Sequence, residues 1–324
     1  MSNNQGVLKK PIPRIYSFGS GQILALELCK YLGLELEKIK EERFPDGEIK
    51  IKPMEAVSSQ DVVILHSMAF EPEQTPNDKI CELLLFISQL KDEGAGSITA
   101  ILPYLSYSRS DQKKDFQDPL TLKHLAILYE AAGIEKIITL DVHNLAAYQN
   151  AFRCSSVNLE AAPLFCDVIK SKGATGSLVV LSPDIGGIKR AEKFRHLLQG
   201  ALAKPVAMAF VEKYREKEGL QGQALVGNVH EADIIIYDDM ISTGKTVLRA
   251  VEAVRKKGAR TVTVIATHGL FSENREALLN SSLINELWVT DSNPTLRRPL
   301  FKEFPKLKVI SCAPLLAQGL GLKS

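Results

Sequence analysis

The chain has 324 residues, enough for two domains that each bury a core of their own. It carries 40 Lys and Arg against 38 Asp and Glu, a formal net charge of +2, which argues against a generally basic nucleic-acid-binding protein. The five cysteines form no C-x-x-C pair, so buried free thiols are expected in place of a zinc knuckle or a disulfide framework. Neither an apolar leader nor the roughly 18 apolar residues of a membrane span occur, which indicates a soluble cytoplasmic protein without a membrane partner.

The first half of the chain alternates short apolar runs with helical patterns. Phe44 to Glu48, FPDGE, is predicted to be a turn that exposes an aromatic ring between polar residues. A strand is predicted over Val62–His66 and a helix over Ile80–Lys91, with glycines at its end and a β-branched strand after them. Taken alone, the FPDGE segment is no more than an ordinary β-turn.

The segment from Tyr104 to Lys114, YLSYSRSDQKK, contains aromatic and basic residues. Its tyrosines can stack on a base, and Arg109, Lys113 and Lys114 can hold phosphate groups. A basic surface loop is an equally compatible interpretation.

A helical pattern over Leu122–Ala132 precedes a strand at Lys136–Leu140, and Asp141-Val142-His143 follows directly. A carboxylate and an imidazole therefore stand at the carboxyl end of a strand, where α/β proteins bind ligands. The pair is compatible with a metal-phosphate site and also with a structural, hydrogen-bonded histidine.

The second half is expected to begin near Asn158–Pro163. A strand at Leu178–Leu181 leads into Ser182–Arg190, SPDIGGIKR, whose two glycines let the backbone approach a ligand that Asp184 can reach directly or through Mg²⁺. An ordinary turn with a solvated Lys-Arg pair remains the alternative. Glu212–Gln223 is charged, contains glycines and has no clear period, so we expect a mobile loop there.

The most informative segment follows the apolar strand Ile234–Tyr237 and reads DDMISTGKT, from 238 to 246, before a helical pattern over Val247–Lys257. Two adjacent carboxylates suit the vicinal hydroxyls of a sugar, and the turn offers N–H groups, hydroxyls and a helix N-terminus to a phosphate. A Walker A loop is excluded because its first glycine would fall at Asp239. The segment is therefore interpreted as a sugar-phosphate cradle.

The two halves look duplicated. The segments 94–102 and 258–266 share the pattern G-A-x-x-φ-T-x-φ, where φ is apolar, and each follows a helical pattern. With the final strand at Leu287–Thr290, the order of elements predicts an α/β protein with two duplicated domains, each a mainly parallel sheet flanked by helices.

Together and in this order, the motifs resemble the ribose-phosphate pyrophosphokinase (phosphoribosyl diphosphate synthetase) family along nearly the whole chain. The matching segments are FPDGEI (44–49), NDKICELLLFISQLK (77–91), ITAILPYLSYSRSD (98–111), IITLDVH (137–143), SPDIGGIKR (182–190), EKYR (212–215), LVGNV (225–229) and DDMISTGKT (238–246).

The resemblance implies two type I phosphoribosyltransferase-like domains. Residues 1–160 would lie on the ATP side and residues 161–324 on the ribose 5-phosphate side, with the last segment able to pack back on the first domain. The implied reaction moves the diphosphoryl group of Mg·ATP to the C1 hydroxyl of ribose 5-phosphate and releases AMP, for nucleotide biosynthesis.

The family's functional residues map onto this chain one by one. Ribose 5-phosphate would be bound by Asp238, Asp239, Ser242, Thr243, Gly244, Lys245 and Thr246. ATP would be bound by Arg109, Asp111 and His143, and by Phe44, Asp46 and Glu48 of a neighbouring subunit in a hexamer built from dimers. A diphosphate loop would contain Asp184, Gly186 and Gly187; the Mg²⁺ ligands would be His143 and Asp184; the catalytic pair on a flexible loop would be Lys213 and Arg215.

Departures from the family pattern concern the nucleotide pocket and control. Ser110 replaces the usual Gln, and residues 147–152 replace the family's Q-G-F segment, so nucleotide preference stays open. Ser242 stands where many members have Asp, a change that leaves the paired acids in place. Where the phosphate-activated class has Ser-x-Arg and a further Arg, this chain has Ala56, Ser58 and Gln117, which predicts weak or absent activation by phosphate.

Two rival functions fit parts of the pattern: a phosphoribosyltransferase and a non-catalytic regulatory homologue of the synthetase. The duplication argues against the first, because such transferases usually have one such domain. The presence of both catalytic basic residues and of the acid pair argues against the second.

Overall fold

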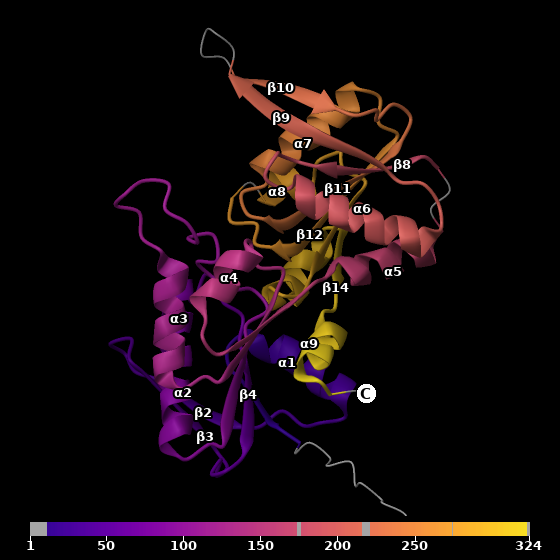
Figure 1. The fold of residues 1–324 in the computed structure, drawn as a ribbon. Helices are drawn as coiled ribbons and strands as arrows, with labels where there is room; N and C mark the ends of the chain where they lie inside the picture. The colour runs from indigo at the N-terminus through magenta and orange to yellow at the C-terminus, as the bar shows by residue number, and fades with distance from the viewer. Residues whose placement is uncertain (1–11, 174–175, 216–220, 274, 323–324) are drawn as a thin grey trace, which may run out of the picture.

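The computed structural model describes residues 12–173, 176–215, 221–273 and 275–322 (Figure 1). Two segments on which expectations rest lie outside this range. They are residues 1–11, where no apolar leader was expected, and residues 216–220, the centre of the expected mobile loop. Among the described residues, no helix combines the length and the apolar character that a membrane crossing requires.

The first half forms a five-stranded parallel sheet within the described residues, in the order β1-β4-β5-β6-β7. Its strands are β1 (Arg14–Ser17), β4 (Asp61–Leu65), β5 (Ser97–Ile101), β6 (Lys136–Leu140) and β7 (Ser155–Leu159). A separate antiparallel hairpin consists of β2 (Ile39–Arg43) and β3 (Ile49–Pro53). The helices are α1 (Gly21–Leu32), α2 (Pro76–Asp92), α3 (Thr121–Ala132) and α4 (Leu145–Ala151).

The second half, so far as it is described, holds a seven-stranded sheet in the order β10-β9-β8-β11-β12-β13-β14. Its strands are β8 (Leu178–Ser182), β9 (Ala207–Arg215), β10 (Gln221–Val226), β11 (Asp233–Ile241), β12 (Thr261–Gly269), β13 (Glu286–Thr290) and β14 (Leu307–Ile310). Its helices are α5 (Ala162–Lys172), α6 (Ile188–Leu202), α7 (Lys245–Lys256), α8 (Arg275–Leu279) and α9 (Ala313–Leu320), with 3₁₀ turns η1 (Pro294–Arg297) and η2 (Pro299–Glu303).

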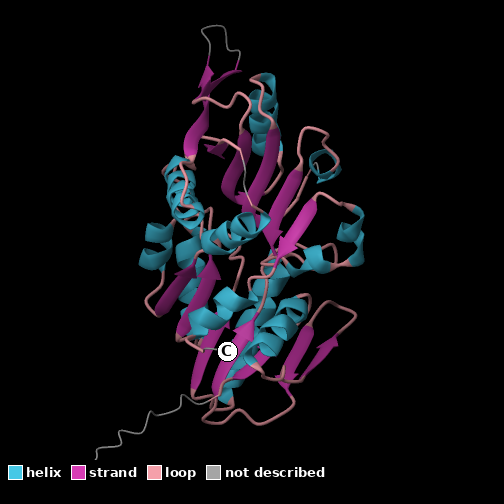
Figure 2. Cartoon of the chain, turned by 90° about the vertical axis from the view of Figure 1, so that its right-hand side faces the viewer, coloured by secondary structure: helices cyan, strands magenta, loops and turns pink. Residues whose placement is uncertain are grey.

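The two halves repeat one arrangement. After α5, which precedes the first strand of the second half, each half has a strand and a helix, then a hairpin, then four more parallel strands in chain order. These are β4 to β7 in the first half and β11 to β14 in the second. The predicted α/β fold with two duplicated, mainly parallel sheets is confirmed, since within the second sheet only β10 runs antiparallel to its neighbour among the described strands. In Figure 2 the strands run between helices.

The expectation of a loop over Glu212–Gln223 is wrong at both of its ends. Strand β9 extends to Arg215, and β10 begins at Gln221, where the two pair antiparallel. The backbone hydrogen bonds of a hairpin satisfy these polar residues, so a ladder forms although the sequence has no clear period of two. This hairpin occupies the same place in the second half as β2 and β3 in the first.

One apolar core joins the halves. It contains Ile15 and Leu28 from the first half and Val180, Tyr237 and Leu316 from the second. Helix α9 returns to lie beside α1 (Figure 1), and the Lys136 ammonium donates to the Gly319 carbonyl over 2.8 Å. Because the halves share buried surface, side chains from both sheets can be held in one fixed site.

The five cysteines are all free, and three of them are buried. Cys81 is exposed on α2 and Cys154 is partly exposed, so the expectation of buried thiols is wrong for these two.

Candidate active site between the two halves

The acid pair lies near the carboxyl end of β11. This strand continues to Ile241, beyond the predicted end at Tyr237, because it pairs in parallel with β12 through Met240 and Ile241. On its other side β11 pairs with β8, so it is a central strand. Asp239 is consequently only 3% exposed, and its carboxylate needs partners of its own.

The first partner of Asp239 comes from the other half of the chain. His143, three residues beyond β6, places Nδ1 2.8 Å from Asp239 Oδ2. The hydrogen bond to Asp239 raises the pKa of His143 despite partial burial. Because an ionised carboxylate can only accept, Nδ1 carries the proton, and Nε2 has no hydrogen-bond partner within the part of the chain described.

The second partner is Arg190, whose role sequence reasoning missed. Its Nη1 lies 2.6 Å from Asp238 Oδ1 and 3.2 Å from Asp239 Oδ1, so one guanidinium bridges both acids. The alternative prediction was a solvated Lys-Arg pair in this turn. Lys189 is exposed and fits it, but the Arg190 side chain is only 25% exposed. The sequence did indicate that Arg190 lies in the first turn of a helix, α6. It did not reveal that β8, which leads into α6, lies next to β11 and so brings Arg190 to the acids.

These contacts separate the acidities of the two carboxyls. Burial and the charge of Asp239 raise the pKa of Asp238 to about 7. Burial acts in the same direction on Asp239, but the hydrogen bond from His143 and the Arg190 charge outweigh it and lower the pKa of Asp239 to about 2. Near neutral pH the pair therefore holds one ionised carboxylate, Asp239, and one carboxyl that is partly protonated, Asp238.

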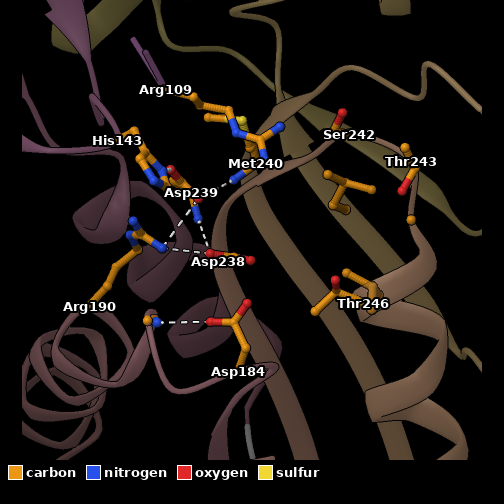
Figure 3. A pocket seen from close by; sticks show the side chains of 15 residues that line it. Arg109, His143, Asp184, Arg190, Asp238, Asp239, Met240, Ser242, Thr243 and Thr246 are labelled. Carbon is orange, nitrogen blue, oxygen red and sulfur yellow. Dashed lines mark hydrogen bonds and ion pairs between the residues drawn. The ribbon is translucent and has the colours of Figure 1, made fainter. Parts of the chain in front are cut away.

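Beyond the acids, the turn from Ser242 to Thr246 leads into α7. Gly244 has φ 75°, a left-handed conformation that favours glycine, and it directly precedes the first residue of the helix. In Figure 3 Ser242, Thr243 and Thr246 lie on one side of the acid pair, with Arg190 and His143 on the other. The turn thus presents hydroxyls and a helix N-terminus to the site, which suits a phosphate.

The residues surround a cavity of about 440 Å³. Most of the predicted site residues contribute to it, together with Arg190; its lining comprises Arg109, His143, Asp184, Gly186, Gly187, Arg190, Asp238, Asp239, Met240, Ile241, Ser242, Thr243, Gly244, Thr246 and Val247. Lys245, predicted to bind the sugar phosphate, is outside the lining because its Nζ lies 3.0 Å from Glu273 Oε2.

The loop after β8 contributes Asp184 and two glycines. The Gly187 N–H donates to Asp184 Oδ1 over 3.1 Å, and the Ser182 hydroxyl donates to the Asp184 carbonyl over 2.6 Å. A Cβ at position 187 would lie 2.7 Å from Ser182 Oγ, so any larger residue there would require the Ser182 side chain to move. The second carboxylate oxygen of Asp184 is not used in this hydrogen bond to Gly187.

No group of three or more His, Cys, Asp or Glu side chains among the described residues is arranged to bind a metal. Magnesium is commonly held by one or two carboxylates while water and phosphate oxygens fill its other positions. Asp184 and the Nε2 of His143, both in the cavity lining, are therefore compatible with a magnesium-bound phosphate ligand.

The remaining predicted residues lie elsewhere. Asp111 is outside the lining of this cavity and borders a smaller one of about 270 Å³, although its charge acts on His143. Phe44, Asp46 and Glu48 lie at the exposed β2–β3 turn, outside this cavity of their own chain. The backbones of Lys213 and Arg215 belong to β9, and their side chains are beyond the described part.

Comparisons with known proteins identify the relatives of the chain. Residues 14–133 match the N-terminal domain of ribose phosphate pyrophosphokinase, and residues 204–321 match a phosphoribosyl synthetase-associated domain. The ribose-phosphate pyrophosphokinase of Brucella melitensis is 33% identical, with 95% of each chain covered. That of Wolinella succinogenes is 36% identical, with 90% of this chain and 89% of the relative covered.

A solved structure gives the same picture. The fold is similar to the crystal structure of phosphoribosylpyrophosphate synthetase from Mycobacterium smegmatis, with a TM-score of 0.87 and 32% identity. The similarity covers 96% of this chain and 98% of the other.

Proposed function

The chain belongs to the ribose-phosphate pyrophosphokinase family, and we propose that it transfers the diphosphoryl group of Mg·ATP to the C1 hydroxyl of ribose 5-phosphate. The products are 5-phosphoribosyl 1-diphosphate and AMP, for nucleotide biosynthesis in the cytoplasm. The observation that carries the proposal is the buried acid pair on β11, joined in one cavity to the hydroxyl-rich turn at the start of α7.

Ribose 5-phosphate fits this cavity in one orientation. The 5-phosphate accepts hydrogen bonds from the turn Ser242–Thr246, and the ribose hydroxyls donate to Asp238 and Asp239. Arg190 holds the two carboxylates beside each other in the absence of sugar. The C1 hydroxyl then faces the side of the cavity lined by Arg109, His143 and Asp184.

The reaction forms a bond between the C1 oxygen and the β-phosphorus of ATP, while the bond from that phosphorus to the α,β-bridging oxygen breaks. The bridging oxygen leaves with AMP, and the proton of the C1 hydroxyl is released to solvent. Such transfers depend on positioning and on neutralisation of phosphate charge more than on covalent catalysis. Magnesium, when bound by Asp184 and His143, supplies part of that neutralisation.

The positive charge on the protein side comes from three places. Arg109 lines the cavity from the first half and contacts the ATP phosphates in this proposal. Lys213 and Arg215, whose backbones belong to β9, are proposed to neutralise charge on the transferred group. A hairpin that closes over the substrates also excludes water and limits hydrolysis of ATP.

We further propose a homo-oligomer, a hexamer built from dimers, in which the β2–β3 turn completes a neighbour's nucleotide pocket. Phe44 is 39% exposed and lies outside its own chain's cavity together with Asp46 and Glu48. These residues serve ATP binding only if they reach a second copy. Analytical ultracentrifugation tests this directly, because a fully active monomer would contradict a shared site.

The decisive experiment uses purified protein with ribose 5-phosphate, Mg²⁺ and ATP, followed by ³¹P NMR for AMP and the diphosphorylated sugar. A parallel reaction without the sugar measures ATP hydrolysis. Absence of both products from a chain that still binds ribose 5-phosphate supports the regulatory homologue. Consumption of added phosphoribosyl diphosphate in the presence of a nucleobase supports a phosphoribosyltransferase.

A further inference from the structure

Two consecutive residues of β12 contact the segment that carries His143. The Thr267 hydroxyl donates to Asp141 Oδ2 over 2.5 Å, and His268 Nε2 lies 3.1 Å from the Leu140 carbonyl oxygen. Thr267 is fully buried and His268 is 2% exposed. Neither residue lines the 440 Å³ cavity, so neither touches a substrate placed there.

The local backbone explains how neighbouring residues reach one target. Successive side chains of a regular strand point to opposite faces, so Thr267 and His268 would diverge. The pairing of β12 with β13 shifts between Ile265 and His268, where three steps along β12 match two from Trp288 to Thr290. Such a bulge re-aims side chains, and bulges are over-represented beside active sites.

The hydrogen bonds of His268 fix its ring in one tautomer. The Leu140 carbonyl can only accept, so Nε2 carries a proton, and Nδ1 then accepts from the Ser292 hydroxyl 2.8 Å away. Burial lowers the pKa of His268 to about 4, which keeps this neutral form at physiological pH. The Tyr104 ring packs edge-on against the imidazole with ring centroids 5.1 Å apart.

Three strand ends therefore meet in a triangle. His143, which follows β6, forms a hydrogen bond with Asp239 of β11. Leu140 and Asp141, in the same segment, accept hydrogen bonds from β12. Strands β11 and β12 pair with each other, with Met240 opposite His268. A second hydrogen bond to the Asp141 carboxylate comes from the Ala161 N–H, which donates to Oδ2 over 3.0 Å. Asp141 has φ 34°, an unusual backbone conformation that these contacts keep in place.

We propose that Thr267 and His268 are positioning residues for the diphosphoryl transfer, because they fix the segment from Leu140 to His143 so that His143 meets Asp239. The proposal rests on the proposed function for its kinetic consequences. It assigns these two residues no contact with substrate. Their effect reaches the reaction through the placement of His143 against Asp239. Both sugar-binding acids keep their contacts with Arg190 when His143 shifts, so the sugar site itself stays in place.

Three variants of the full-length protein test it. Thr267→Val removes the hydroxyl and keeps the volume, whereas Thr267→Ser keeps the hydroxyl. Thr139→Val is the matched control, since Thr139 is equally buried and its hydroxyl donates to Val157 within the first half, over 3.4 Å. Turnover, KM for both substrates, ribose 5-phosphate affinity by calorimetry and thermal stability are measured for each.

Thr267→Val is expected to lower kcat by about 10- to 100-fold, the range that a small misplacement of a reacting group produces. Its affinity for ribose 5-phosphate should stay within about twofold, and Thr267→Ser and Thr139→Val should both turn over like the wild type. Wild-type kcat in Thr267→Val overturns the proposal. So does a parallel loss of kcat and sugar affinity, or a failure of Thr267→Ser to restore turnover.

A second readout does not depend on activity. The ¹⁵N chemical shifts of the His143 ring report which nitrogen carries the proton, and in the wild type that is Nδ1, bonded to Asp239. Thr267→Val should move these shifts towards a mixture of tautomers, and unchanged shifts overturn the positioning role. A wild-type protein that forms no product refutes the proposed function, while the NMR comparison still tests the placement of His143.

Discussion

His143 and Asp239 share a hydrogen bond of 2.8 Å although 96 positions separate them in the chain. One follows the strand β6 of the first sheet, and the other lies in β11 of the second. Without the first half, Asp239 would lose its hydrogen bond with His143 and retain Arg190, although its carboxylate is almost completely buried. The site is therefore a property of the interface between the two halves, and the shared apolar core that keeps them together also keeps the site in shape.

The acid pair should dominate recognition of the sugar. We expect Asp239→Ala to weaken ribose 5-phosphate binding by roughly 10- to 100-fold, since a buried hydrogen bond to a charged group contributes about 1.5–3 kcal/mol. Calorimetric titration gives the dissociation constant. Asp233→Ala is the control, because Asp233 begins the same strand but pairs with Arg260 far from the cavity. Wild-type affinity in Asp239→Ala would contradict the cradle.

Arg190 should control the acidity of that pair. Its charge lowers the pKa of both carboxyls, so Arg190→Met should raise both values and leave more of the pair protonated at neutral pH. The variant should bind ribose 5-phosphate more weakly than the wild type, with the largest deficit near pH 6 and partial recovery towards pH 8.5. Dissociation constants measured across this pH range check the trend. The control is Lys189→Met, which removes the exposed neighbouring charge and should change neither the affinity for ribose 5-phosphate nor its pH dependence.

Lys213 should act on turnover more than on binding. Lys213 belongs to β9, one strand of the β9–β10 hairpin. In the proposed function, its charge meets the transferred diphosphoryl group only when the hairpin closes over the substrates. Lys213→Ala should therefore lower kcat strongly while substrate dissociation constants change little. A variant with unchanged turnover and weakened binding would make the residue a docking contact.

Most of the correctly predicted strands follow from short apolar runs that can be recognised locally in the sequence. The runs Val62–His66, Lys136–Leu140 and Leu178–Leu181 differ from β4, β6 and β8 by one residue at most at either end, because buried parallel strands are short and continuously apolar. Most residues of the proposed cradle line one cavity for the same reason, since strand, turn and helix are contiguous in the chain. Lys245 is the exception, as its side chain is drawn to Glu273 in a distant loop.

The contacts of Arg190 and Thr267 could not be predicted from the sequence, because they depend on which strands become neighbours. Arg190 reaches the acids because β8 lies beside β11, and Thr267 reaches Asp141 because the two halves pack together. The β9–β10 hairpin was missed because its polar residues carry no period of two. The duplication offered one signal for it, since the first half has a hairpin at the equivalent place.

The buried His268 should make stability depend on pH. Its pKa is lowered from 6.5 to about 4 in the folded protein, so between these values the unfolded chain binds a proton that the folded one refuses. This contribution to stability is complete above about pH 6.5 and is lost as the pH falls towards 4, with a slope of at most about 1.4 kcal/mol per pH unit. Urea unfolding of wild type and His268→Gln at pH 7, 6 and 5 should show the wild type losing more stability.

The last prediction concerns control by phosphate. The phosphate-activated class of the family has guanidinium groups where this chain has Ser58 and Gln117, both exposed here. A guanidinium offers a fixed pair of donors that matches phosphate, and the nearby lysines do not reproduce it. Lys113 is already engaged, since its Nζ lies 3.0 Å from the Phe116 carbonyl oxygen and over the Phe116 ring.

We therefore expect initial rates at saturating ATP and ribose 5-phosphate to change little when phosphate is added. Inhibition by ADP should be mainly competitive with ATP, because the same anion site would be needed for a distinct allosteric effect. The double variant Ser58→Arg and Gln117→Arg restores two guanidinium groups at the family positions and should gain a response to phosphate. A large activation of the wild type would show that other basic residues rebuild the anion site, in which case the double variant should add nothing further.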